Sequence, residues 1–452
     1  MRSTIGLGLI GGALALRSEK IDFFAQQQAL LQGACPSNYI LQNEECRPSA
    51  ESTMVQSALT IESNATHVAQ FTHSLEESRN RALQSKSFPW SFWPECFIAS
   101  HDSDPFCVFS NTEFASGRGI SIVTTHAIAY SMLENDAFKD LDALEYSNNY
   151  ENPPFYEKVF PGKGRGLVAN KTLNRGDQIF SSTPILITDD LDGLPESERL
   201  ALWHRAIAAL PAATREIFWS LAPRFPDGET DAHEDRITTN YFEVEVDGNM
   251  LSGLFPEIAR INHDCRPNAA YFFDEETLTH RVHAIRDIYP GEELSITYIN
   301  NEAPRDKRMK RLSNGWGFKC SCSSCSAHPR LVAESDARLV QMKKVIDVLN
   351  DWSETSAATP AHAELLVSLY KQERLHAGLS TAYQHASEVY SSFGMKWEAV
   401  RYARLSLEWS MLDKGWGDRD VAAMTRMATE PESTWSWNRR LSLKSCGCGK
   451  SH

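Results

Sequence analysis

A nine-residue stretch, Arg260-Ile-Asn-His-Asp-Cys-Arg-Pro-Asn268, constrains the fold of this chain more than any other part of the sequence. The polar pair Asn262 and His263 comes directly after the largely apolar run 254–261, and Cys265 follows two residues later. The Pro-Asn pair that ends the stretch predicts a turn. So many special residues in so little space indicate a loop that holds functional side chains.

Two further motifs follow this stretch. Residues 291–298 read Gly-Glu-Glu-Leu-Ser-Ile-Thr-Tyr and predict a strand that ends on Tyr298, after a Pro-Gly turn. Residues 316–325 contain three cysteines in the spacing C-x-C-x2-C, namely Cys320, Cys322 and Cys325. Three thiolates on one short loop are typical of a zinc site, and tetrahedral zinc takes a fourth ligand. His328 is the nearest candidate in the sequence, and thiols without metal, or disulfides, are the alternative.

Together the three motifs resemble the Asn-His-x-Cys-x-Pro-Asn signature, the catalytic tyrosine strand and the post-SET zinc cluster of SET-domain protein-lysine methyltransferases. The resemblance covers about residues 153–326. It implies a mixed α+β chain with a SET fold of short strands, a helical insert and a zinc-bound post-SET loop. In that fold the C-terminal strand is knotted through a loop, which brings Tyr298 beside Asn262 and His263.

The cofactor implied by the resemblance is S-adenosylmethionine, which suits a glycine turn because glycine lets other groups approach the backbone closely. A Gly-Arg-Gly sequence occurs at 117–119 and again at 164–166. We expect the second copy to contact the cofactor and the first to form a hairpin or an added strand. The expected cofactor-binding residues are Gly164, Arg165, Gly166, Asn262, His263 and Phe318. Phe318 either stacks on adenine or packs as a core aromatic.

Methyl transfer is an in-line displacement that needs an aligned, neutral amine and the exclusion of water. The resemblance implies that Tyr298 is the catalytic residue, and we expect its phenol, with partial phenolate character, to hydrogen-bond the lysine nitrogen. Tyr241 and Tyr271 are the expected substrate-channel residues. The resemblance also supplies the fourth zinc ligand in preference to His328, so that the expected set is Cys265, Cys320, Cys322 and Cys325. Glu292 and Glu293 are expected to be solvated carboxylates.

The chain of 452 residues predicts two or three domains. Residues 194–222 predict two helices, and the basic run 305–311 predicts a solvated helix face. Apolar stripes after residue 335 predict antiparallel helices of tetratricopeptide-like character, without a clean 34-residue period. The expected boundaries are a signal peptide at 1–18, a cysteine-containing region at 19–150, a SET domain at 153–300 with an insert at about 190–225, a post-SET segment at 301–328 and a helical domain at 331–445.

Net charge and composition limit the classes of molecule that the chain is expected to bind. The net charge of −14 argues against general nucleic-acid binding and favours a negative cleft that attracts lysine-rich segments. No stretch is long enough for a transmembrane helix. The resemblance implies that the chain methylates a lysine-containing protein or peptide, and we expect it to be a monomer. The signal-like N-terminus favours the secretory pathway, whereas the cofactor favours the cytoplasm or the nucleus. The alternative function is therefore a SET-fold interaction module that is secreted and transfers no methyl group. A MYND finger, found in one branch of the family, is missing before the insert.

Overall fold

The computed structural model describes residues 39–42, 45–48, 88–98, 104–225, 228 and 230–446. The chain divides into two compact units, Met1–Phe97 and Ile98–His452. In the first unit, β1 (Tyr39–Gln42) and β2 (Glu45–Pro48) form an antiparallel pair, and β3 spans Glu95–Phe97. The predicted signal peptide at 1–18 lies outside the described residues.

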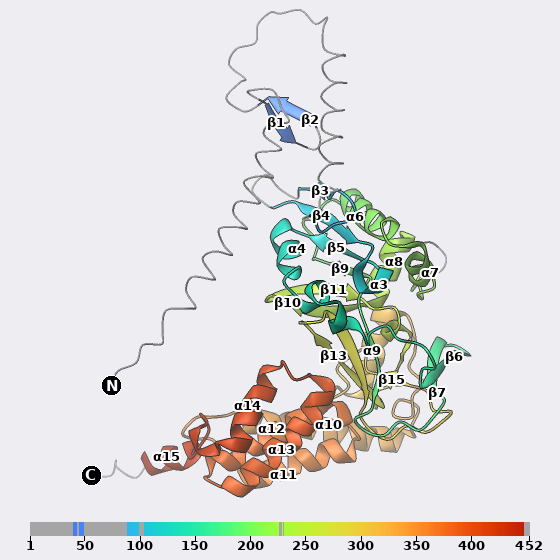
Figure 1. Cartoon of the computed structure of the whole chain (residues 1–452). Coiled ribbons are helices and arrows are strands. Elements are labelled where there is room, and N and C mark those ends of the chain that lie inside the picture. The colour runs from blue at the N-terminus through green and yellow to red at the C-terminus, as the bar shows by residue number, and fades with distance from the viewer. Residues whose placement is uncertain are drawn as a thin grey trace, which may run out of the picture. The chain divides into compact units, whose positions relative to one another are not determined.

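The largest sheet of the second unit has the strand order β10-β11-β9-β5-β4 (Figure 1). Its strands are β4 (Phe106–Asn111), β5 (Ile120–Thr124), β9 (Leu186–Thr188), β10 (Tyr241–Val246) and β11 (Asn249–Leu254). Strand β5 is buried along its whole length and pairs in parallel with β9 and antiparallel with β4. The first Gly-Arg-Gly copy, at 117–119, therefore leads into an interior strand of this sheet. Short helices flank the strand: α3 (Phe114–Gly117), α4 (His126–Met132) and α5 (Asp136–Lys139).

Three smaller strand groups surround the signature. The sheet β13-β14-β8 consists of β13 (Ala269–Asp274), β14 (Thr279–Ala284) and β8 (Gln178–Ser182), and β6 (Phe155–Phe160) pairs with β7 (Gly164–Ala169) as a hairpin. The signature itself forms the short strand β12 (Asn262–His263), which runs parallel to β15 (Ser295–Ile296). The strand expected up to Tyr298 is thus shorter than predicted. The preceding Leu294 instead donates its N–H to the carbonyl of Leu167, which ties this segment to β7.

The insert contains three helices, α6 (Glu196–Ala208), α7 (Ala212–Trp219) and α8 (Ala232–Asn240), where the sequence analysis predicted two. Helix α8 was missed, although it has a recognisable start. The side chain of Asp231 accepts the N–H groups of His233 and Glu234, which is how an N-cap satisfies the free donors of a first turn. The following strand, β10, consequently begins at Tyr241.

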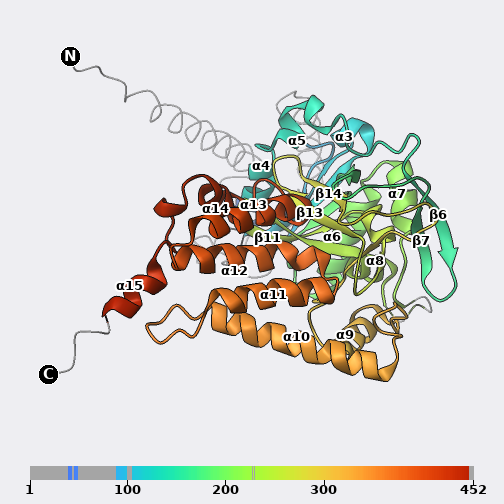
Figure 2. The ribbon, with the colours of Figure 1, turned by 90° about the horizontal axis from the view of Figure 1, so that it is seen from below.

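The C-terminal part is helical, and neighbouring helices α10 to α13 lie side by side (Figures 1 and 2). After α9 (Arg305–Trp316) come α10 (Pro329–Leu349), α11 (Pro360–Gln372), α12 (Leu379–Ser392), α13 (Lys396–Asp413), α14 (Arg419–Thr429) and α15 (Arg439–Cys446). The apolar stripes predicted from sequence meet in one buried core, which includes Leu339, Met342, Tyr383 and Ala403. The mixed α+β class is confirmed. Among the described helices, none combines the length and apolar character needed to cross a bilayer.

Candidate active site and cysteine cluster

A cavity of about 1380 Å³ opens between the β6–β7 turn, the insert and the segment around α9. Its wall is assembled from residues 161–165, 220–224, 238–243, 259–260, 262–263, 297–298 and 314–316, among others. The predicted residues that line it are Gly164, Arg165, Tyr241, Asn262, His263, Tyr271, Tyr298 and Phe318. The fold therefore brings the predicted catalytic, channel and cofactor residues to one place, with the exception of Gly166.

Tyr298 is fixed at both ends. Its hydroxyl donates to the carbonyl oxygen of Ile261 at 2.7 Å, and its backbone N–H donates to Nδ1 of His263 at 3.1 Å. The ring lies 5.3 Å from that of Trp316 between centroids. Burial raises the pKa of Tyr298, so the side chain is a neutral phenol at physiological pH. The partial phenolate character expected from the sequence is therefore wrong for this structure.

His263 connects the tyrosine segment to the cysteines. Burial lowers the pKa of His263 to about 4, so its ring is neutral. Because Nδ1 accepts the N–H of Tyr298, the ring proton resides on Nε2, which lies 3.3 Å from Sγ of Cys265. The imidazole thus donates to the cysteine and holds Tyr298 at the same time. Its side chain therefore positions two neighbouring groups, the thiol of Cys265 and the backbone of Tyr298.

Asn262 is held by groups that the sequence analysis did not assign to the site. Its Nδ2 donates to Oε1 of Glu293 at 2.9 Å, and the other carboxylate oxygen of Glu293 pairs with Nζ of Lys163 at 2.8 Å. Glu293 is therefore not the solvated carboxylate that was expected. A Cβ atom on Gly166 would collide with the Asn262 amide and with the ring of Phe160. Glycine is thus required at position 166, because the Asn262 side chain packs directly against its backbone. The Asn262 side chain and the Phe160 ring cover Gly166, and Gly166 does not line the cavity.

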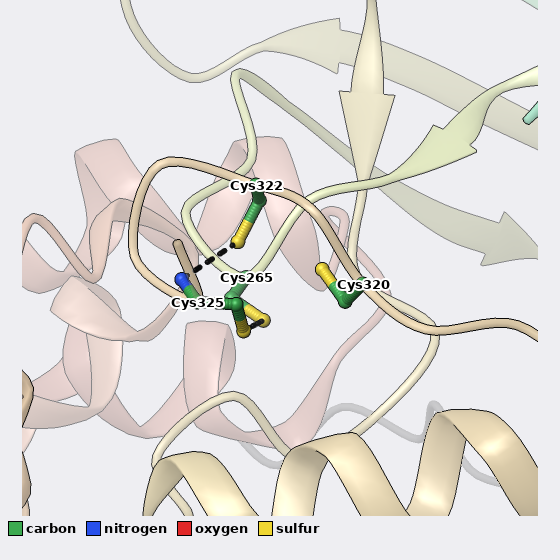
Figure 3. A group of neighbouring side chains, drawn as sticks. All are labelled: Cys265, Cys320, Cys322 and Cys325. Atoms are coloured by element: carbon green, nitrogen blue, oxygen red, sulfur yellow. Dashed lines mark hydrogen bonds between the residues drawn. The ribbon is translucent and has the colours of Figure 1, made fainter. Parts of the chain in front are cut away.

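Four buried thiols form a cluster beside this cavity (Figure 3). The Sγ atoms of Cys265, Cys320, Cys322 and Cys325 all lie within 4.8 Å of one another, and those of Cys265 and Cys325 are 3.6 Å apart. Zinc–sulfur bonds of about 2.3 Å in a tetrahedron place sulfurs roughly 3.8 Å apart, so the four side chains fit zinc. His328 is not part of the cluster, because it caps α10 through the N–H of Arg330.

Arg308 is the cluster's charged neighbour and was missed by the sequence analysis. Its side chain is 1% exposed, although it belongs to the basic run predicted as a solvated face. One guanidinium nitrogen donates to the carbonyl of Ala303 at 2.6 Å, and another donates to Ser324 at 3.2 Å and lies 4.0 Å from Sγ of Cys325. A buried guanidinium this close compensates thiolate charge. The available signal was its i,i+4 spacing to Leu312, which is buried on the same helix.

A buried ion-pair network attaches the signature loop to the C-terminal helices. Glu373, at the end of α11, receives bonds of 2.6 Å each from Arg266, Arg338 and Ser335. The side chains of Arg266 and Glu373 are only 5% and 4% exposed. Burial alone would raise the pKa of Glu373, but the hydrogen bonds from Ser335, Arg266 and Arg338 outweigh it and lower the pKa. Since Arg266 adjoins Cys265, the network supports the cysteine cluster from the helical side.

Replacing Glu373 with alanine is expected to destabilise the protein by about 3–5 kcal/mol, because the Arg266 charge is then buried without its carboxylate. The contribution of Glu373 is complete at neutral pH and is lost as the pH falls through its lowered pKa. Urea unfolding at pH 7 measures the effect. The matched control is Glu334→Ala, which removes an exposed pair with Arg330 and should cost less than about 1 kcal/mol. Equal losses for the two variants would contradict this prediction.

Comparison with known proteins gives consistent matches in this region. The SET domain family matches residues 164–299. The chain is 31% identical over 203 residues to "Histone-lysine N-methyltransferase set5" of Schizosaccharomyces pombe, which covers 43% of this chain and 58% of that protein. It is 30% identical over 155 residues to human "N-lysine methyltransferase SMYD2", which covers 34% of this chain and 33% of that protein. The aligned region therefore spans less than two thirds of each of these relatives.

Proposed function

We propose that this chain, which belongs to the SET-domain methyltransferase family, transfers methyl groups from S-adenosylmethionine to lysine side chains of proteins. One observation carries the proposal: a single cavity gathers Tyr298, the Asn262–His263 pair and the Gly164 turn, which lie far apart in the sequence. The names of the matched relatives, a histone-lysine and an N-lysine methyltransferase, support the same reaction. The alternative of an inactive interaction module is not favoured, because such a module would not need these residues to line one cavity.

The cavity suits the cofactor at several points. Gly164 has a φ of +78°, and a Cβ atom there would meet nothing within 4 Å, so the turn borders open space. Arg165 offers a cation, Asn262 an amide, and Phe318 a ring face for adenine. When bound, S-adenosylmethionine supplies a methyl group activated by a sulfonium. We assign the binding of this cofactor to the turn 164–166, to Asn262 and His263, and to Phe318.

Tyr298 would orient the amine that receives the methyl group. Because its hydroxyl hydrogen is engaged by the carbonyl of Ile261, its oxygen lone pairs can accept an N–H from a neutral lysine amine. Accepting that bond fixes the direction of the amine's own lone pair, which must lie in line with the bond that breaks. Tyr241 and Tyr271 line the same cavity and would shield the amine from water.

The zinc site belongs to the same proposal. Cys265 comes from the signature loop and the other three ligands from the 320–325 loop, so one Zn²⁺ would join the two segments. We further propose that the strand leading to Tyr298 passes through a loop as a knot. We also propose that the SET domain spans 153–300 and the post-SET segment 301–328, and that the C-terminal helices have tetratricopeptide-like character. The parallel pairing of β12 with β15 supports the knotted passage.

The direct test is incubation of the purified chain with S-adenosylmethionine labelled in the methyl group, together with histones and with a whole-cell protein extract. Label on protein that survives acid hydrolysis as methyl-lysine is the expected result, and mass spectrometry of the labelled bands then identifies the substrate. A preparation that binds zinc and the cofactor but labels no protein would overturn the proposal in favour of a binding module.

Replacing Asn262 with alanine is expected to raise the KM for S-adenosylmethionine roughly tenfold, because one or two hydrogen bonds of about 1 kcal/mol each are lost. The KM for the protein substrate should change little. Initial rates at varied cofactor concentration measure the effect. Asn174→Ala is the matched control, since that amide is exposed and lies outside the cavity wall. An unchanged cofactor KM in the Asn262 variant would remove this residue from the binding site.

A further inference from the structure

The charges on the cavity wall have the opposite sign to the net charge of the chain. Among the residues that the structure describes, six cationic side chains and one carboxylate, that of Glu243, line the cavity; the cations are Lys163, Arg165, Arg224, Arg260, Arg311 and Lys319. Cys320 and Cys322 also line it, but they belong to the cluster that Arg308 faces. The expectation of a negative cleft that attracts lysine-rich segments, drawn from the net charge of −14, is therefore wrong for this cavity.

Three of the six cations are already paired. Lys163 binds Glu293 at 2.8 Å, and Arg260 and Arg165 share the carboxylate of Glu157 at 3.1 and 3.8 Å. These three adjoin the 161–165 turn and the signature, which is where the proposed cofactor contacts lie. Two carboxylates thus compensate part of the charge of these three cations, and the other cations are the candidates for selecting a protein substrate.

The remaining three cations have no carboxylate within ion-pair distance in the described part of the chain. Arg224 lies in the segment between α7 and α8, with its guanidinium 4.7 Å from the ring of Phe225. A Cβ atom on Gly317 would lie 3.8 Å from its Cγ, so Arg224 adjoins the loop that begins after α9. Arg311 and Lys319 are exposed on α9 and on that loop. Uncompensated cations thus stand on two elements of the wall, the insert and the post-SET segment.

We propose that the protein segment taken by this site carries acidic residues beside the target lysine, which Arg224, Arg311 and Lys319 bind. The inference rests on the proposed function and adds a substrate class to it. Uncompensated charge in a cavity attracts the opposite sign and repels its own, so a segment rich in Lys and Arg is disfavoured here. The tyrosines of the same wall receive the lysine, while its acidic neighbours face the insert and the post-SET segment.

Three peptide pools test the inference. They share a central lysine and are otherwise randomised, but the positions flanking the lysine are Asp/Glu in one pool, Ser/Gln in the second and Lys/Arg in the third. We expect kcat/KM for the acidic pool to exceed that for the neutral pool roughly tenfold, since three ion pairs in a cavity open to solvent contribute about 0.2–1 kcal/mol each. The basic pool should be the poorest, and the differences should shrink at 1 M salt.

Charge-reversal variants identify the residues responsible. Arg224→Glu, Arg311→Glu and Lys319→Glu should each reduce the preference for the acidic pool and leave the KM for S-adenosylmethionine unchanged. The control is Lys343→Glu, which alters an exposed lysine on α10 that does not line the cavity, and it should keep the wild-type preference.

The outcomes separate the inference from the proposed function. Methylation of the basic pool as fast as the acidic pool would overturn the inference and leave lysine methylation standing. Variants that raise the cofactor KM and keep the peptide preference would show that these cations serve the cofactor, which also overturns it. No transfer to any pool or to the protein extract would remove the proposed function, and the inference with it.

Discussion

Replacing Cys322 with serine is expected to abolish zinc binding and methyl transfer together. The four Sγ atoms lie within 4.8 Å of one another, and three remaining thiols cannot complete a tetrahedral site. Binding of structural zinc contributes about 10–16 kcal/mol in small zinc domains, so the loss of one ligand removes much of what would hold the 320–325 loop to Cys265. Cys265 is three residues from Asn262, and His263 contacts both Cys265 and Tyr298, so the disturbance reaches the cavity.

The measurements are zinc content by elemental analysis and labelled methyl transfer on the same preparation. Ser323→Ala is the matched control, because Ser323 is an exposed residue of the same loop and is not among the four clustered side chains. It should keep both zinc and activity. If Cys322→Ser lost its metal while turnover stayed intact, the link between the cluster and the cavity would be wrong.

Replacing Tyr298 with phenylalanine is expected to lower kcat by about 10²–10³-fold, the loss typical when one positioned hydrogen-bonding group is removed from an active site. The ring would still pack against Trp316, so the fold should survive. The lost bond from the hydroxyl to the carbonyl of Ile261 should cost only about 1 kcal/mol of stability. The KM for cofactor should change little, because the hydroxyl is assigned to the amine.

Steady-state kinetics and a thermal melt of the same variant separate a catalytic role from a structural one. Tyr289→Phe serves as the control, since Tyr289 is 58% exposed and lies outside the cavity wall. It should retain wild-type kcat. A Tyr298→Phe variant with kcat within twofold of the wild type would exclude this tyrosine as the group that orients the lysine.

Much of the candidate site could be predicted from short motifs. The spacing of Cys320, Cys322 and Cys325 predicts a metal-binding loop, because three ligands on one short loop are close together in almost any fold. The fourth residue, Cys265, came from the family resemblance, and the structure places it among the other three. Helices with regular apolar stripes, such as α10 and α12, were predictable for the same reason: the periodicity is local. Helix α8 was not predicted, although its N-cap residue Asp231 was a local signal for a helix start.

Other features depended on contacts between distant segments. The burial of Arg308 follows from the position of the cysteine cluster and not from its own basic run, which reads as a solvated face. The pairing of Glu293 with Asn262 and Lys163 joins residues some thirty to 130 positions apart, and no local pattern announces it. The neutral state of Tyr298 likewise comes from burial, which only packing creates.

The sequence by itself determined the chemistry that the chain can carry: the tyrosine, the asparagine–histidine pair, the glycine turn and the four cysteines. Only the tertiary structure decided which charges face the substrate. A net charge of −14 is a sum over all residues, whereas the potential inside a cavity depends on the few groups that line it and on their partners. Folding compensates Lys163 and Arg260 with carboxylates and leaves Arg224, Arg311 and Lys319 without them.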